Sequence, residues 1–201
     1  RTNLDFIKGN SNQIKTIMLT SFNSNSGKTF ITTNLGISHA LTGKKVIILD
    51  LDMRKSDLSR NFKNTDVGVS DYLGGFIEDP NKIIIKDVGE SVLDVIPVGT
   101  IPPNPTELLL SERLSTLLTY LKDNYDYVLI DCPPIDIVAD TSIIEKQVDF
   151  TIFVVRAGLL DRRMVPELEN IYQKKRFKNM ALILNGSTLT HNKYGYYYDK
   201  Y

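Results

Sequence analysis

Two kinds of hydrophobic pattern alternate along the chain. Short runs of consecutive apolar residues predict buried strands, and segments in which apolar residues recur every three or four positions predict helices. Strands are expected at residues 14–21, 46–52, 93–98, 127–131, 150–155 and 181–184. Helices are expected at residues 28–42, from the proline-rich turn at 101–105 to about Asn124 with Thr106 as N-cap, at 140–146 and at 164–176. This alternation predicts an α/β fold in which helices flank a mostly parallel central sheet.

The region between the second and third predicted strands, residues 53–90, has a weaker pattern. A short helix is expected around Asp71, and Ile83–Ile85 fits either a short strand or a helix. The length suggests one domain over residues 1–186. Residues 187–201 lack apolar periodicity, and we expect them to form a flexible tail.

Composition excludes several classes of protein. The 24 basic side chains equal the 24 acidic ones, which argues against a broad nucleic-acid-binding face. A lone cysteine, Cys132, allows no internal disulfide. No apolar run approaches the roughly 20 residues of a membrane-spanning helix, and the start at Arg1 shows no signal-peptide pattern. The missing initiator Met suggests a processed or excised chain.

A candidate phosphate-binding loop joins the first predicted strand to the first predicted helix. It ends in Gly27-Lys28-Thr29, where Lys28 can reach the β- and γ-phosphates and the Thr29 hydroxyl can bind Mg²⁺. The residues expected to contact nucleotide here are Asn25, Ser26, Gly27, Lys28, Thr29 and Phe30. The pattern is incomplete because Phe22 stands where such loops carry glycine, so an ordinary strand–turn–helix connection is the alternative.

Acidic residues end two further predicted strands. Asp50 and Asp52 follow one strand, and Asp131 follows another. In a parallel sheet these ends meet at one edge with the loop, where carboxylates can hold Mg²⁺ or accept a proton. Each aspartate alone could instead cap a helix. Arg54 is expected either to contact phosphates or to lie in a solvated turn.

Five other side chains give less specific signals. Cys132 is expected to be a small buried residue rather than a nucleophile. Arg156, Arg162 and Arg163 are expected to be surface charges, and His39 a surface or packing residue.

The C-terminal segment is rich in tyrosine. Five of the ten tyrosines lie in the last eight residues, namely Tyr194, Tyr196, Tyr197, Tyr198 and Tyr201. They could pack on a neighbouring protein, or they could accept phosphate from the nearby nucleotide site. A phenol has an ordinary pKa of about 10, so a strand-end aspartate would have to take its proton during transfer.

The ordered motifs resemble those of the bacterial tyrosine kinases (BY-kinases) of capsule and exopolysaccharide assembly. They are GKT at 27–29, DLDMR at 50–54, IPPNPTELL at 101–109, LIDCPP at 129–134 and the terminal tyrosines. The resemblance implies a P-loop fold related to the partition and cell-division ATPases. It also implies ATP and Mg²⁺ as cofactors, and autophosphorylation of the tail, mainly between subunits, that regulates polysaccharide synthesis and export.

The resemblance also assigns roles to single residues. Lys28 and Thr29 match the Walker A lysine and hydroxyl, Asp50 and Asp52 the Walker A′ pair, and Asp131 the Walker B aspartate. It thus implies the catalytic residues Lys28, Asp50, Asp52 and Asp131, and the Mg²⁺ ligands Thr29, Asp50 and Asp131. Asn185 resembles a residue that contacts adenine in related folds.

The family further implies a location and partners. The domain would lie on the cytoplasmic side of the bacterial inner membrane, with a fused or separate transmembrane polysaccharide-copolymerase activator and a tyrosine phosphatase. Copies would assemble into a ring through a helix motif E-x-x-R-x-x-R. Arg1 resembles the last arginine of that motif. Because its upstream part is missing, we expect this chain to form the ring poorly.

Two other functions compete with the kinase. One is a partition- or division-type ATPase switch without tyrosine kinase activity, and the other is an interaction module with a decayed loop. Asn23 occupies the place of the signature lysine of partition ATPases, which favours the kinase.

Overall fold

The computed structural model describes most of the chain between Ile14 and Ser187. The described ranges are 14–62, 66–88, 93–135, 140–177 and 179–187. Arg1 and the five tail tyrosines lie outside them.

Six strands form one sheet in which every neighbouring pair is parallel. The strand order is β3-β2-β4-β1-β5-β6. The bounds are β1 Thr16–Thr20, β2 Val46–Asp50, β3 Leu93–Ile96, β4 Tyr127–Asp131, β5 Phe150–Arg156 and β6 Met180–Asn185. All six agree with the apolar runs in the sequence, so the predicted α/β fold is confirmed.

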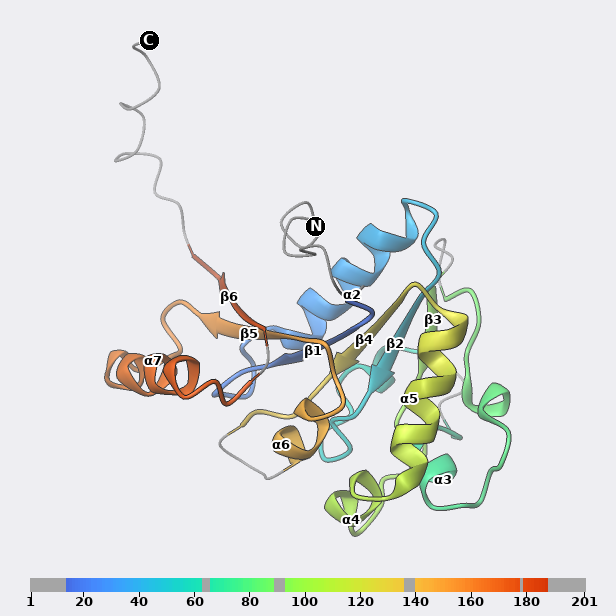
Figure 1. Ribbon diagram of the computed structural model, residues 1–201. Coiled ribbons are helices and arrows are strands. Elements are labelled where there is room, and N and C mark those ends of the chain that lie inside the picture. Colours follow the sequence, from blue (N-terminus) through green and yellow to red (C-terminus); the bar gives the residue numbers. More distant parts are fainter. Residues whose placement is uncertain (1–13, 63–65, 89–92, 136–139, 178, 188–201) are drawn as a thin grey trace.

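Helices lie on both sides of this sheet (Figure 1). The α-helices are α2 Lys28–Ala40, α3 Val69–Leu73, α4 Pro105–Leu109, α5 Glu112–Asn124, α6 Asp140–Glu145 and α7 Val165–Gln173. Short 3₁₀ turns are η1 Ser59–Asn61, η2 Pro80–Ile83 and η3 Arg162–Met164. Helix α2 covers one face, and α5, α6 and α7 lie on the other (Figure 1). None of the helices in the described ranges is long and apolar enough to cross a membrane.

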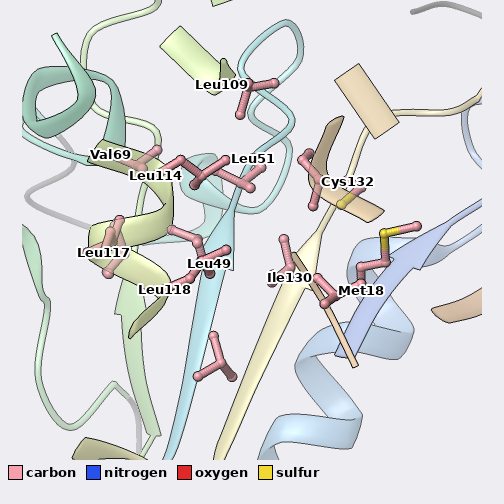
Figure 2. Close-up of a cluster of buried hydrophobic side chains, with 14 of the residues drawn as sticks. Met18, Leu49, Leu51, Val69, Leu109, Leu114, Leu117, Leu118, Ile130 and Cys132 are labelled. Atoms are coloured by element: carbon pink, nitrogen blue, oxygen red, sulfur yellow. The ribbon is translucent and has the colours of Figure 1, made fainter. Parts of the chain in front are cut away.

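The larger core lies between the sheet and α5. Leu117 and Leu118 of α5 point toward Leu49 of β2, close to Ile130 of β4 (Figure 2). These side chains are almost completely buried. Their burial follows from the one-sided apolar stripe of α5, which removes a continuous apolar surface from water.

The opposite face carries a smaller core beneath α2. It includes Ile17 and Leu19 of β1, which alternate with Met18 of the larger core, as expected for neighbouring side chains on a strand. His39 of α2 is buried and stacks on Tyr127, with ring centroids 4.2 Å apart. His39 is therefore a packing residue, one of the two readings of the sequence.

The long helix predicted from the proline-rich turn to Asn124 is wrong in detail. It consists of two helices separated at Leu110 and Ser111, where Ser111 has extended backbone angles. Thr106 is not the N-cap, because Asn104 precedes Pro105 at the first helical position. The Thr106 hydroxyl instead donates to Asp140 Oδ1 at 2.6 Å. Of the three residues Ile83–Ile85, which fitted either a strand or a helix, Ile83 ends η2. Ile85 forms an isolated antiparallel bridge with Val95.

The two-sided core makes a direct stability prediction. Leu117→Ala should lower the free energy of unfolding by about 2–5 kcal/mol, because Leu117 is fully buried and the change leaves a cavity. Leu110→Ala is the matched control: Leu110 is 66% exposed, and its loss should change stability by no more than about 0.5 kcal/mol. Urea unfolding measures both, and equal effects would contradict the described packing.

Candidate functional site

The loops that follow β1, β2 and β4 meet at one edge of the sheet because β4 lies between the other two strands. Beyond the strands, Leu51 N–H donates to Asp131 O at 2.9 Å, and Cys132 N–H donates to Leu19 O at 3.1 Å. Asp50 and Asp131 are direct neighbours in the β2–β4 register. The predicted convergence of the phosphate loop and the acidic strand ends is therefore present.

The phosphate loop keeps its shape with few glycines. Asn25 takes the left-handed conformation, with φ of 61°, which asparagine tolerates better than most residues. The hydroxyls of Ser21 and Ser26 both donate to Asn23 O, at 2.7 and 2.8 Å. Phe22, which replaces a glycine of the pattern, is buried and packs edge-on against Phe153.

Gly27 is required by both its backbone and its surroundings. Its φ is 91°, and a Cβ there would lie 2.2 Å from Asn185 Nδ2. That amide donates to Ser26 O at 2.9 Å, so Asn185 at the end of β6 fixes the loop from outside. The structure thus places Asn185 beside the phosphate loop, while its proposed contact with adenine remains a prediction.

Lys28 and Thr29 begin helix α2 and face the carboxylates. Lys28 is buried, and its charge interacts with Asp52 and Asp131. Thr29 Oγ1 donates to Asp131 Oδ2 at 2.5 Å. Asp131 Oδ1 is buried without a hydrogen-bond partner among the described residues. An unpaired, buried carboxylate oxygen beside a threonine hydroxyl is a donor set that suits a hard cation.

The environment of the two strand-end carboxylates raises their pKa values. Burial, with the nearby charge of Asp50, raises the pKa of Asp131 to about 7, although the Thr29 hydrogen bond opposes this shift. Burial raises the pKa of Asp50 to about 6, against the hydrogen bonds from Ser59. Two anions close together in a buried site favour either protonation or a bound cation.

Asp50 is already engaged by a loop that the sequence did not connect with the site. Its Oδ2 accepts from Ser59 N at 3.1 Å and from Ser59 Oγ at 2.6 Å, while its Oδ1 accepts from Asp52 N at 3.1 Å. Ser59 Oγ in turn accepts from Val98 N at 2.9 Å. Asp50 therefore holds together the loops after β2 and β3.

Asp52 is the more open of the two aspartates after β2. Its Oδ1 accepts from Lys55 N at 3.2 Å. Burial raises the pKa of Asp52, and the charge of Lys28 partly offsets this. Asp52 thus lies beside the lysine of the phosphate loop, in a position to interact with a group that approaches from outside.

Among the described residues, the Arg54 side chain bonds α4 and α6 rather than the phosphate loop. Its Nε donates to Asp140 Oδ2 at 3.3 Å and its Nη2 to Thr106 Oγ1 at 3.4 Å. The neighbouring Lys55 Nζ donates to Ser24 Oγ at 3.1 Å. The predicted phosphate contact of Arg54 remains a prediction, and the guanidinium lies in an ordered ion pair rather than in a freely solvated turn.

An open cavity of about 720 Å³ adjoins the phosphate loop. Its walls include Lys28, Phe30, Asp57, Phe62 and Arg156. Phe30 is 69% exposed, so it offers an apolar surface to a ligand. The size and lining of the cavity suit a nucleotide next to the residues expected to bind its phosphates.

Arg156 is a site residue that sequence reasoning missed. It ends β5, and its Nη1 donates to Asn25 O at 2.8 Å in the phosphate loop. The sequence suggested a surface charge. Its position after a strand next to β1 was the available signal, but the strand order was needed to use it.

Two further features, the Cys132 thiol and a polar cavity, are not part of the candidate site. Cys132 is fully buried, which raises the pKa of its thiol well above the ordinary value, and this confirms the packing role. A cavity of about 330 Å³ contains Lys86, Asp94 and Tyr125 at another part of the sheet. Those three side chains already bond one another at 2.5–2.8 Å.

The site fits Mg²⁺ held partly by phosphate and water. Within the described ranges no three His, Cys, Asp or Glu side chains form a metal-binding group. Mg²⁺ commonly uses only one or two protein ligands together with substrate phosphates and waters. The Thr29 hydroxyl and the unpaired oxygen of Asp131 match that requirement.

Comparisons with known proteins agree with this geometry. Residues 14–155 match a family model described as an AAA domain. The tyrosine-protein kinase CpsD of Streptococcus agalactiae is 34% identical over 98% of this chain and 86% of the relative. A putative tyrosine-protein kinase in the cps region of Klebsiella pneumoniae is 38% identical over 89% of this chain, which spans only 25% of that relative.

Solved structures show the same likeness. The kinase domain of the Escherichia coli tyrosine kinase ETK superposes with a TM-score of 0.86 and 32% identity, covering 100% of this chain and 78% of that one. A chain of the MinC:MinD cell division protein complex of Aquifex aeolicus shares the fold alone, with a TM-score of 0.68 and 24% identity over 85% of this chain and 68% of that one. With this fold, this loop and these relatives, the chain belongs to the family of bacterial tyrosine-protein kinases.

Proposed function

We propose that this chain is an ATP-dependent tyrosine autokinase that transfers the γ-phosphate of ATP to its own C-terminal tyrosines, mainly those of a neighbouring copy. The observation that carries the proposal is the contact of Thr29 with Asp131, whose second oxygen is buried and unpaired among the described residues. That arrangement lies at the mouth of a phosphate loop and suits a metal–triphosphate complex.

The loop would bind the nucleotide through its backbone and through Lys28. Backbone N–H groups at the start of α2 are aligned with the helix dipole, which favours phosphate. Thr29 and Asp131 would hold Mg²⁺, with Asp50 close by and tied to Ser59. When bound, Mg²⁺ supplies charge stabilisation for phosphoryl transfer.

The acceptor phenol would lose its proton to an aspartate. Asp52 is the most accessible choice, because Asp50 already accepts bonds from Ser59 and Asp131 accepts from Thr29. As the O–P bond to the tyrosine forms, the bond from the γ-phosphorus to the bridging oxygen breaks and ADP leaves. The phenol proton goes to the carboxylate.

The acceptor tyrosines are proposed from the sequence of the tail. Because all six strands are parallel, β6 ends at the same edge of the sheet as the phosphate loop. The chain therefore continues toward residues 188–201 from the edge that carries the site. Tyr194, Tyr196, Tyr197, Tyr198 and Tyr201 are the proposed acceptors.

The wider setting is also a proposal. We place residues 1–186 as the kinase domain and 187–201 as its substrate tail, on the cytoplasmic side of the bacterial inner membrane. Proposed partners are other copies in a ring, a transmembrane activator and a tyrosine phosphatase. The support is a relative named for a cps region, consistent with a role in capsular polysaccharide synthesis.

A division-type ATPase switch is the second candidate, since a chain of the MinC:MinD cell division protein complex shares the fold. Such a switch would turn over ATP without forming phosphotyrosine. The same incubation therefore separates the two functions.

Incubation with Mg-ATP should place phosphate on residues 194–201. Lys28→Met should reduce this labelling on the order of 100-fold or more, because Lys28 is the buried cation at the phosphates. Lys44→Met is the control, since Lys44 is exposed just beyond α2. Mass spectrometry of the tail at several protein concentrations measures the result, and transfer between copies predicts labelling that rises with concentration.

ATP turnover without phosphotyrosine would contradict the kinase proposal and support the switch. Undiminished labelling in Lys28→Met would contradict the role of the loop.

When neither metal nor nucleotide is bound, Asp131 should make the free energy of unfolding depend on pH. Its pKa rises from 3.8 unfolded to about 7 folded, so the folded state holds the proton more tightly. Stability should therefore fall as pH rises from about 4 to about 7, by up to about 4 kcal/mol. Asp131→Asn should remove much of this fall and gain stability relative to the parent at pH 8.

Denaturant unfolding at pH 5 and pH 8 measures this difference, with the exposed Asp123→Asn as control. Mg-ADP should stabilise the parent more than Asp131→Asn. An equal pH dependence in the two proteins would refute a buried, perturbed Asp131.

A further inference from the structure

A second ionic cluster lies beside the candidate site, on three segments that are far apart in the sequence. It consists of Arg54 after β2, Thr106 in α4 and Asp140 at the start of α6. Asp140 is almost completely buried, and it accepts from both other residues. A buried carboxylate needs such partners, so the cluster fixes Arg54 rather than leaving it free.

Among the residues that the structure describes, the guanidinium uses only two of its nitrogen atoms for hydrogen bonds. Nε and Nη2 contact Asp140 and Thr106, yet the Arg54 side chain is 39% exposed. Arginine has five N–H donors in a flat fork, and a second edge can bind another carboxylate. Because Asp140 and Thr106 hold the fork in one orientation, little side-chain entropy is lost on binding.

The position of Arg54 points to the acceptor rather than to the nucleotide. Arg54 does not contribute to the wall of the cavity beside the phosphate loop, and it follows Asp52 by two residues. The Asp52 carboxylate interacts both with the backbone N–H of Arg54 and with the charge of the buried Lys28. An acceptor that gives its proton to Asp52 therefore comes close to the Arg54 backbone.

The tail carries a matching group. Residues 187–201 contain one acidic side chain, Asp199, directly after Tyr196–Tyr198. We propose that Arg54, oriented by Asp140 and Thr106, binds the Asp199 carboxylate of an incoming tail and so positions a tyrosine of that cluster beside Asp52. This proposal rests on the proposed kinase function, for which it supplies a specificity-determining contact.

The test pairs two changes, one on each side of the contact. The enzyme is the full chain with its five tail tyrosines changed to Phe and its own Asp199→Asn, so that its tail cannot compete. The acceptors are C-amidated peptides of residues 187–201, with and without Asp199→Asn. Amidation removes the terminal carboxylate, which Arg54 could otherwise bind.

Arg54→Gln should raise KM for the unchanged peptide about tenfold, because a charge-assisted contact is lost. Asp199→Asn in the peptide should raise KM by a similar factor with the unmodified Arg54. The two changes together should give no further rise, since both remove one contact. Arg54→Lys should recover part of the loss by keeping the charge without the fork.

Arg60→Gln is the matched control, because Arg60 is an exposed arginine of the same region that pairs with Asp57. Binding of fluorescent peptide to the Mg-ADP form, measured by anisotropy, repeats the comparison without turnover. This arm keeps the inference testable if no phosphotyrosine forms, in which case the kinase function fails by itself. Thermal melting checks that each variant is folded.

If the rises in KM from Arg54→Gln and from Asp199→Asn multiply when both changes are present, the contact is overturned. A rise in KM for ATP with an unchanged KM for the peptide would also overturn it. An Arg60→Gln effect as large as that of Arg54→Gln would show general electrostatic attraction instead. Loss of coupling in both the kinetic and the binding measurement would refute the inference even if the tail is phosphorylated.

Discussion

The parallel pairing of β4 with both β1 and β2 determines the site. It brings Asp50 and Asp131 into direct register and places Thr29 against Asp131. Two buried carboxylates side by side are unfavourable without protons or a cation, and the raised pKa values express that cost. The surrounding cores on both faces of the sheet supply the stability that keeps this arrangement in place.

The three aspartates at this edge of the sheet differ in their surroundings. Asp50 accepts from Ser59, which also connects the loop after β2 to Val98 beyond β3. Asp131 has one oxygen toward Thr29 and one that is unpaired among the described residues, whereas Asp52 is more accessible. Chemically similar residues therefore have different environments because their hydrogen-bond partners differ.

The sequence predicted the features that depend on local pattern. Buried strands have continuous apolar runs, and the strand-end aspartates and the GKT loop follow them directly. The sequence did not predict the features that depend on tertiary contacts. The apolar spacing continues through Leu110, so the sequence does not show the break before α5. The position of Arg156 after a strand relates it to the site only once the strand order is known, and Ser59 has no local signal.

The glycine-poor loop illustrates why a motif has to be judged by its contacts. Phe22 fits because its side chain enters the core against Phe153, and Asn25 supplies one left-handed residue. Only at Gly27 do the backbone angle and the approach of Asn185 together exclude a side chain. The loop therefore retains the glycine that its geometry requires, and departures elsewhere in the pattern leave its shape intact. The proposed contacts with phosphate would then come from Lys28, Thr29 and the backbone N–H groups at the start of α2.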